Sequence, residues 1–180
     1  GIDGDFILAA GTLEPRKNIP ALIEAFRELA PKTDAQLVLA GPTGWGITPE
    51  ELLGPVDNVT KARICITGEI TTAQLAALYT EATVFCYPSL LEGFGLPVLE
   101  AMSYRTPVVT SKGTSTEEVA GDAAVMVNPN SVIEISEALA RLVIDKSAAR
   151  EIGDAGYQRS KLFTWDKAAS ATVDIYRKLL

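Results

Sequence analysis

Short apolar runs alternate with helical patterns along nearly the whole chain. Each run is four or five residues long and is apolar on both faces, which is typical of strands covered on both sides by helices. The alternation predicts a parallel sheet with crossover helices, an α/β class of fold. We therefore expect a doubly wound, six-stranded sheet in the order 3-2-1-4-5-6. The expected strands are 6–10, 36–40, 63–67, 83–87, 107–111 and 124–127.

Size and composition favour one soluble globular domain that fills 1–180. The chain has 180 residues, of which 47% are hydrophobic and 22% charged. No apolar run approaches the roughly 18 residues that a membrane span needs. The net charge of −7 argues against a nucleic-acid surface. The chain starts at Gly1 without methionine, so we expect a piece of a longer protein.

Cysteine and histidine usage narrows the chemistry further. Cys65 and Cys86 fall in expected strands about three strand spacings of ~4.8 Å apart, too far for a disulfide. We expect both to be buried thiols of a cytoplasmic protein. The chain has no histidine, which excludes histidine-based acid–base catalysis and most types of zinc site in this segment. We expect no metal.

The loop after the fourth expected strand combines two glycines with two carboxylates. Gly93 and Gly95 leave backbone N–H groups uncovered, and a helix begins directly after them. Such a turn can cradle an anion. Glu92 and Glu100 bracket it eight positions apart. Since carboxylates would repel a phosphate, we expect them to accept hydrogen bonds from sugar or ribose hydroxyls. A ligand with phosphates in its middle and hydroxyls at both ends is a nucleotide sugar.

The loop after the first expected strand carries the cations Arg16 and Lys17. In the expected strand order, this loop and the Glu92 loop meet at the switch point of the sheet. The two cationic side chains and the anion-binding glycine turn would then lie in one crevice. Taken alone, each feature has a plainer interpretation: Arg16–Lys17 as a solvated turn, and Glu100 as a favourable acid near a helix start. We also expect Asn18 to cap the first helix and Trp165 to anchor the last helix in the core.

Several segments together resemble a known family. They are Gly11-Thr12-Leu13-Glu14-Pro15-Arg16-Lys17-Asn18, the stretch from Tyr87 to Ala101, Pro107-Val108-Val109-Thr110-Ser111, Glu118-Val119-Ala120-Gly121-Asp122-Ala123-Ala124 and Phe163-Thr164-Trp165-Asp166. With the spaced pair Glu92 and Glu100, the chain resembles the C-terminal, donor-binding half of retaining glycosyltransferases of the GT-B fold, family 4 (glycosyl transferases group 1), a Rossmann-like domain. The first segment looks mannosyltransferase-like.

The resemblance implies a role for each matching position. Glu100 would hold the ribose hydroxyls, and Glu92 would contact the transferred sugar. Lys17 and Arg16 would sit on the diphosphate and act in catalysis together with Glu92. The expected donor-binding set is Gly11, Thr12, Gly68, Ile70, Gly93, Phe94, Gly95, Leu96 and Glu100, with the nucleobase near Gly68 to Ile70. Two positions depart from the family: Thr12, where many relatives have arginine, and Tyr104-Arg105, where a small residue followed by glycine is common.

The expected function follows from the resemblance. It is a metal-independent transfer of a hexosyl group, mannose first, to a glycan or lipid-linked acceptor, with a nucleoside diphosphate sugar as substrate and no cofactor. GDP-mannose is the first expected donor and a UDP-sugar the second. An N-terminal acceptor domain would precede this chain, which alone would transfer little or nothing. The expected location is the cytoplasm, with peripheral attachment of the full-length protein to the inner membrane face left open. A noncatalytic nucleotide-binding module, an epimerase and a phosphorylase are the alternatives.

Overall fold

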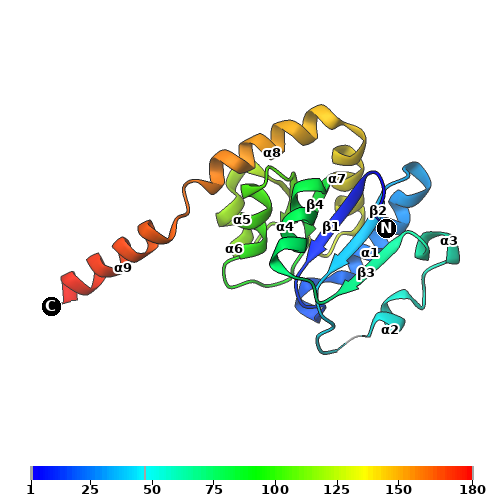
Figure 1. Ribbon diagram of the computed structural model, residues 1–180, viewed down its shortest axis with the longest axis horizontal. Helices are drawn as coiled ribbons and strands as arrows, with labels where there is room; N and C mark the ends of the chain where they lie inside the picture. The colour runs from blue at the N-terminus through cyan, green and yellow to red at the C-terminus, as the bar shows by residue number, and fades with distance from the viewer. Residues whose placement is uncertain (1, 47, 180) are drawn as a thin grey trace.

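The sheet has the expected topology. In this computed structural model, which describes residues 2–46 and 48–179, six parallel strands lie in the order β3-β2-β1-β4-β5-β6. Figure 1 shows β3, β2, β1 and β4 side by side in this order. Their bounds are β1 (Phe6–Ala10), β2 (Gln36–Ala40), β3 (Ile64–Gly68), β4 (Val84–Tyr87), β5 (Val108–Ser111) and β6 (Val125–Val127). The order confirms the doubly wound α/β fold, and it makes β1 and β4 neighbours across the switch point.

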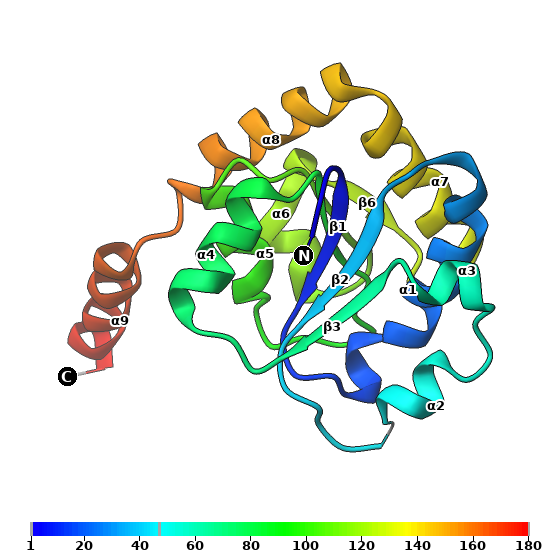
Figure 2. The same ribbon diagram turned by 45° about the vertical axis from the view of Figure 1, so that its right-hand side comes forward.

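Helices cover both faces of the sheet (Figure 2). One face packs against α1 (Ile19–Leu29), α7 (Val132–Ile144) and the start of α8 (Lys146–Ser160). The other packs against α4 (Thr72–Glu81), α5 (Leu96–Ser103) and α6 (Ser115–Ala120). Side chains of β1 alternate between the two cores: Ile7 points to the first and Leu8 to the second. This double burial explains why the strands are apolar on both faces.

Shorter helices fill the connections. They are the α-helices α2 (Pro49–Leu53) and α3 (Asn58–Lys61) and the 3₁₀ turns η1 (Pro15–Lys17), η2 (Ala30–Lys32) and η3 (Gly121–Ala123). Of these, η1 matters most for the site, because it follows β1 and presents Arg16 and Lys17.

The last helix, α9 (Trp165–Leu179), extends away from the body of the domain (Figure 1). None of its described residues is buried, and Trp165 is 81% exposed. The expectation that Trp165 anchors this helix in the core is therefore wrong. Phe163 makes the contact instead, with its ring edge-to-face to Phe94 at a centroid distance of 5.9 Å.

Asn18 does not cap α1 with its side chain, contrary to expectation. Its backbone is left-handed, with φ of 58°, and its side chain makes no capping hydrogen bond to the helix. The amide nitrogen donates to the carbonyls of Pro88 (3.1 Å) and Pro129 (2.7 Å). Asn18 thus ties the loop after β1 to the loop after β4.

Arg105, one of the two departures from the family, has a structural explanation. Its φ of 62° is left-handed, a conformation that glycine adopts without cost. The arginine side chain pairs with Asp154 and lies over the Tyr157 ring, 4.0 Å from its centroid. Its neighbour Tyr104 stacks on Tyr79 at 5.7 Å. These contacts join the turn at Tyr104 and Arg105 to α8 and α4.

Two expectations from composition can be compared with the coordinates. Cys65 and Cys86 are both free thiols, with β2 and β1 between their strands. Cys86 is buried as expected, but Cys65 is only half-buried, so the expectation of burial is wrong for Cys65. Within residues 2–46 and 48–179, no helix is both long and apolar enough to cross a bilayer.

Candidate functional site

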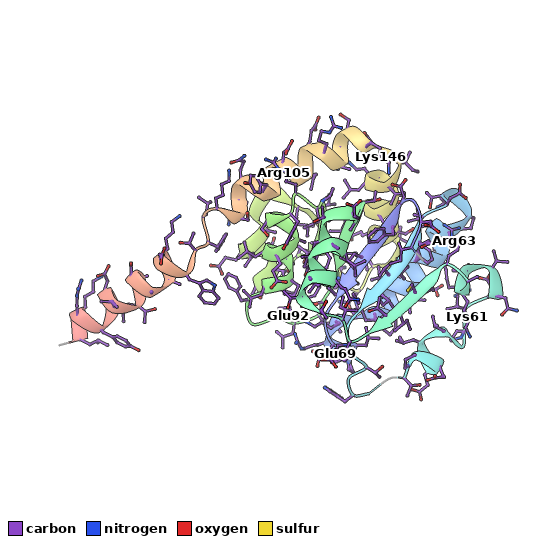
Figure 3. The ribbon with its side chains drawn as sticks, in the orientation of Figure 1. Lys61, Arg63, Glu69, Glu92, Arg105 and Lys146 are labelled. Carbon is purple, nitrogen blue, oxygen red and sulfur yellow. The ribbon has the colours of Figure 1, made fainter. Side chains whose placement is uncertain are left out.

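The loops after β1 and β4 share one crevice, as the strand order predicts. The Leu90 N–H donates to the Arg16 carbonyl at 2.8 Å, and Asn18 adds the bond to Pro88 described above. Glu92 lies at the end of the sheet opposite Lys146, at the same end as Glu69 (Figure 3). Residues about 75 positions apart in sequence therefore form one site.

Glu92 holds both cations of this crevice. Its Oε2 lies 2.5 Å from Arg16 Nη1, and its Oε1 lies 2.7 Å from Lys17 Nζ. The side chains of Glu92 and Lys17 are only 8% and 9% exposed, whereas that of Arg16 is 43% exposed. Burial raises the pKa of Glu92, but hydrogen bonds from Lys17, Tyr87 and Arg16 outweigh burial and hold this pKa below its usual value. Glu92 is thus a buried carboxylate.

Tyr87 is a site residue that the sequence interpretation missed. Lys17 Nζ donates to the Tyr87 hydroxyl and also lies 4.6 Å from the centroid of its ring. Burial, followed by the charge of Glu92, raises the pKa of Tyr87, so its hydroxyl stays protonated. The only signal in the sequence was a hydroxyl-bearing residue at the last position of β4. Tyr87 positions the Lys17 ammonium.

The glycine turn offers backbone donors beside this cluster. Gly95 has φ of +101° and precedes α5 without any side-chain cap. No acceptor among the described residues takes the N–H groups of Phe94, Gly95 or Leu96. These groups lie at the positive end of the α5 dipole, so they can receive an anion.

Residues at the start of α6 contact the glycine turn between Glu92 and Gly95. The sequence interpretation missed these contacts as well. Ser115 Oγ donates to the Glu92 carbonyl at 2.9 Å. A β-carbon on Gly95 would come within 2.7 Å of Cγ2 of the buried Thr116. The backbone between Glu92 and Gly95 is therefore held in place by α6.

Glu100 lies on α5, outside the cation cluster. Tyr79 donates its hydroxyl to Glu100 Oε2 at 3.1 Å, and burial, followed by the Glu100 charge, raises the pKa of Tyr79. Glu100 also lines a cavity of about 760 Å³ between α5 and the α8–α9 connection, together with Phe94, Leu96 and Phe163. This geometry leaves its carboxylate accessible to a ligand hydroxyl.

The remaining expected donor-binding residues lie on neighbouring strand ends. A β-carbon on Gly11 would lie 3.6 Å from Lys17 Cε, so Gly11 borders the cluster directly. Gly68 ends β3, and its carbonyl accepts from Gly41 N–H at 3.1 Å. Ile70 is half-buried against the α4-side core, and Thr12 is exposed.

Gly41 is a third missed residue. Any β-carbon there would lie 2.2 Å from the Gly11 carbonyl oxygen, so only glycine lets the loops after β1 and β2 approach this closely.

Among residues 2–46 and 48–179, no group of three or more His, Cys, Asp or Glu side chains is arranged to hold a metal ion.

Comparison with known proteins identifies the family. Residues 3–159 match the model of the glycosyl transferases group 1 family. The chain therefore belongs to the glycosyl transferases group 1 family. It is 40% identical over 178 residues to the O-antigen chain mannosyltransferase B of Escherichia coli, covering 97% of this chain and 46% of the relative.

Solved structures show the same fold. Sucrose-phosphate synthase from Thermosynechococcus elongatus superposes with a TM-score of 0.85 at 28% identity, covering 98% of this chain and 46% of that protein. The C-terminal domain of a glycosyl transferase group 1 family protein from Francisella tularensis superposes with a TM-score of 0.79 at 26% identity, covering 89% and 87%. The expected fold class is confirmed. The chain spans about half the length of the E. coli mannosyltransferase and of the sucrose-phosphate synthase, at 46% of each.

Proposed function

We propose that this chain is the donor-binding domain of a retaining glycosyltransferase that works without a metal ion. The whole protein would move a hexosyl group from a nucleoside diphosphate sugar to a glycan or lipid-linked acceptor. One observation carries the proposal: Arg16 and Lys17 converge on Glu92 beside the uncommitted N–H groups of the glycine turn. Family membership supports it independently.

The proposed chemistry needs charge stabilisation more than acid catalysis, because a nucleoside diphosphate leaves as a stable anion. Lys17, Arg16 and the start of α5 would stabilise the negative charge that develops on the departing diphosphate. Glu92 would accept hydrogen bonds from the sugar, and Glu100 from the ribose. The base would lie near Gly68 to Ile70. Retention of configuration rests on the family resemblance alone.

Mannose is the first candidate for the transferred sugar, with GDP-mannose as donor. The similarity to a relative named as a mannosyltransferase supports this choice. A UDP-sugar is the second candidate.

The acceptor and the cellular location are further proposals. We propose that acceptor binding requires an additional N-terminal domain, since this chain covers 46% of the E. coli relative. We propose a cytoplasmic location, which the two free cysteines support.

Calorimetric titration of this chain with GDP, UDP and ADP tests the proposal. We expect weak binding of one of the three, which also identifies the nucleotide. Absence of heat with all three, in a sample shown to be folded by circular dichroism, would overturn it.

A further inference from the structure

The charged groups of the crevice balance one another. Arg16 contacts two carboxylates, Glu14 at 2.7 Å and Glu92 at 2.5 Å, while Lys17 contacts Glu92 at 2.7 Å. Two cations thus face two carboxylates. The cluster as a whole offers no excess positive charge, so an anionic ligand must compete with Glu92 for Arg16 and Lys17.

Glu92 cannot move far from an incoming ligand. Its carbonyl accepts from Ser115 Oγ at 2.9 Å, and the Leu90 N–H holds the same loop to Arg16. Its carboxylate is also nearly buried, at 8% exposure. When a diphosphate takes the cations, Glu92 therefore stays beside it and needs new hydrogen-bond donors, because a buried carboxylate without partners is costly.

Two ligands answer this need differently. In a nucleotide sugar, the second phosphate is esterified and carries one negative charge, and the sugar hydroxyls can donate to Glu92. In a bare nucleoside diphosphate, the terminal phosphate approaches two negative charges near neutral pH and has only acceptors to offer. Glu92 would therefore repel the bare nucleoside diphosphate. In the nucleotide sugar, by contrast, the sugar hydroxyls would donate hydrogen bonds to the Glu92 carboxylate.

Resting on the proposed function, we infer that Glu92 is a specificity-determining residue that favours the nucleotide sugar over the bare nucleoside diphosphate. The Glu92 carboxylate would orient the sugar before transfer and lower the affinity for the nucleoside diphosphate that remains after transfer. No other carboxylate of the described residues contacts both Arg16 and Lys17, so this discrimination belongs to Glu92.

Isothermal titration of wild type and Glu92→Gln with GDP and GDP-mannose tests the inference; UDP and UDP-glucose replace them if the chain selects uridine. Glutamine keeps the size of the side chain but removes its charge. We expect Glu92→Gln to bind GDP about tenfold more tightly and GDP-mannose no more tightly than wild type does. Glu24→Gln, which removes a glutamate paired with Arg27 on α1 at 2.6 Å, is the matched control and should change neither affinity.

A second measurement uses the wild-type protein alone, in case Glu92→Gln does not fold. The β-methyl ester of GDP has the lower charge of a nucleotide sugar but no sugar. We expect it to bind more tightly than GDP does. Tighter binding of GDP than of its ester, or equal effects of Glu92→Gln on GDP and GDP-mannose, would overturn the inference. Failure of wild type to bind any of these nucleotides would instead overturn the proposed function.

Discussion

Lys17 is the cation that the site encloses most completely. It is 9% exposed and has Glu92 and Tyr87 as partners. Removing one preorganised stabiliser of developing charge typically lowers kcat by about 10²–10³. We expect Lys17→Ala in the full-length enzyme to lose sugar transfer to this extent, measured with radiolabelled donor. Lys32→Ala, an exposed lysine in η2, is the control and should retain activity. Near-wild-type turnover of Lys17→Ala would remove Lys17 from the mechanism.

Glu92 should also make stability depend on acidity. Its pKa in the folded state lies below the value of 4.5 for a free glutamate, so its stabilising contribution is complete above pH 4.5 and is lost as pH falls through the folded pKa. We expect the free energy of unfolding to fall more steeply in wild type than in Glu92→Gln as the pH drops below 4.5. Urea unfolding across this range measures the difference. Parallel curves for the two proteins would contradict the expected ion pairing.

At the residue level, the sequence predicted the charged members of the site better than their supports. Arg16, Lys17 and Glu92 could be paired because strand order alone brings their loops together. Tyr87 and Ser115 could not be found this way, because a tyrosine in a strand and a serine at the start of a helix look like ordinary core and surface residues. Their roles depend on side-chain directions that only packing determines.

The beginning of α5 depends on a single glycine. Gly95→Ala introduces strain at φ of +101° and places a β-carbon 2.7 Å from Cγ2 of Thr116, whose side chain is fully buried. We expect it to lower the free energy of unfolding by about 2 kcal/mol and to weaken nucleotide binding. Gly113→Ala is the matched control, because Gly113 has φ of +78° but nothing within 4 Å of a β-carbon. It should cost about 1 kcal/mol. Equal costs for the two variants in urea unfolding would show that Thr116 does not constrain the turn.

At the level of elements, the strands were predictable because their short, continuously apolar runs alternate with helical patterns along the chain. Each expected strand overlaps an observed one. The start of α1 was predictable but the role of Asn18 was not. Asparagine is favoured both as an N-cap and in a left-handed turn. Here its side chain bonds to the carbonyls of Pro88 and Pro129, which are distant in sequence, so the sequence could not show that it would not cap the helix.

The whole molecule divides into a packed body and an exposed α9. Trp165 buries almost nothing, whereas Phe163 contacts Phe94 and lies 5.3 Å from the Arg159 guanidinium. We expect Trp165→Ala to change the free energy of unfolding of this chain by less than about 0.5 kcal/mol and Phe163→Ala to lower it by about 1 kcal/mol. Chemical denaturation compares the two matched variants. A larger loss from Trp165→Ala would mean that α9 packs on the body in solution.

The sequence could not predict the exposure of α9. Its pattern predicts a helix with one apolar face, but periodicity does not say which surface covers that face. The doubly wound body, in contrast, was predictable in full, because strands that are apolar on both faces and alternate with helices have few alternative arrangements.

A crystal structure of this chain with the nucleoside diphosphate that it binds most tightly tests the central claim most directly. We expect the diphosphate within hydrogen-bonding distance of Lys17 Nζ and of the N–H groups at Gly95 and Leu96. A diphosphate bound elsewhere, with Lys17 still paired only to Glu92 and Tyr87, would contradict a donor site between the loops after β1 and β4.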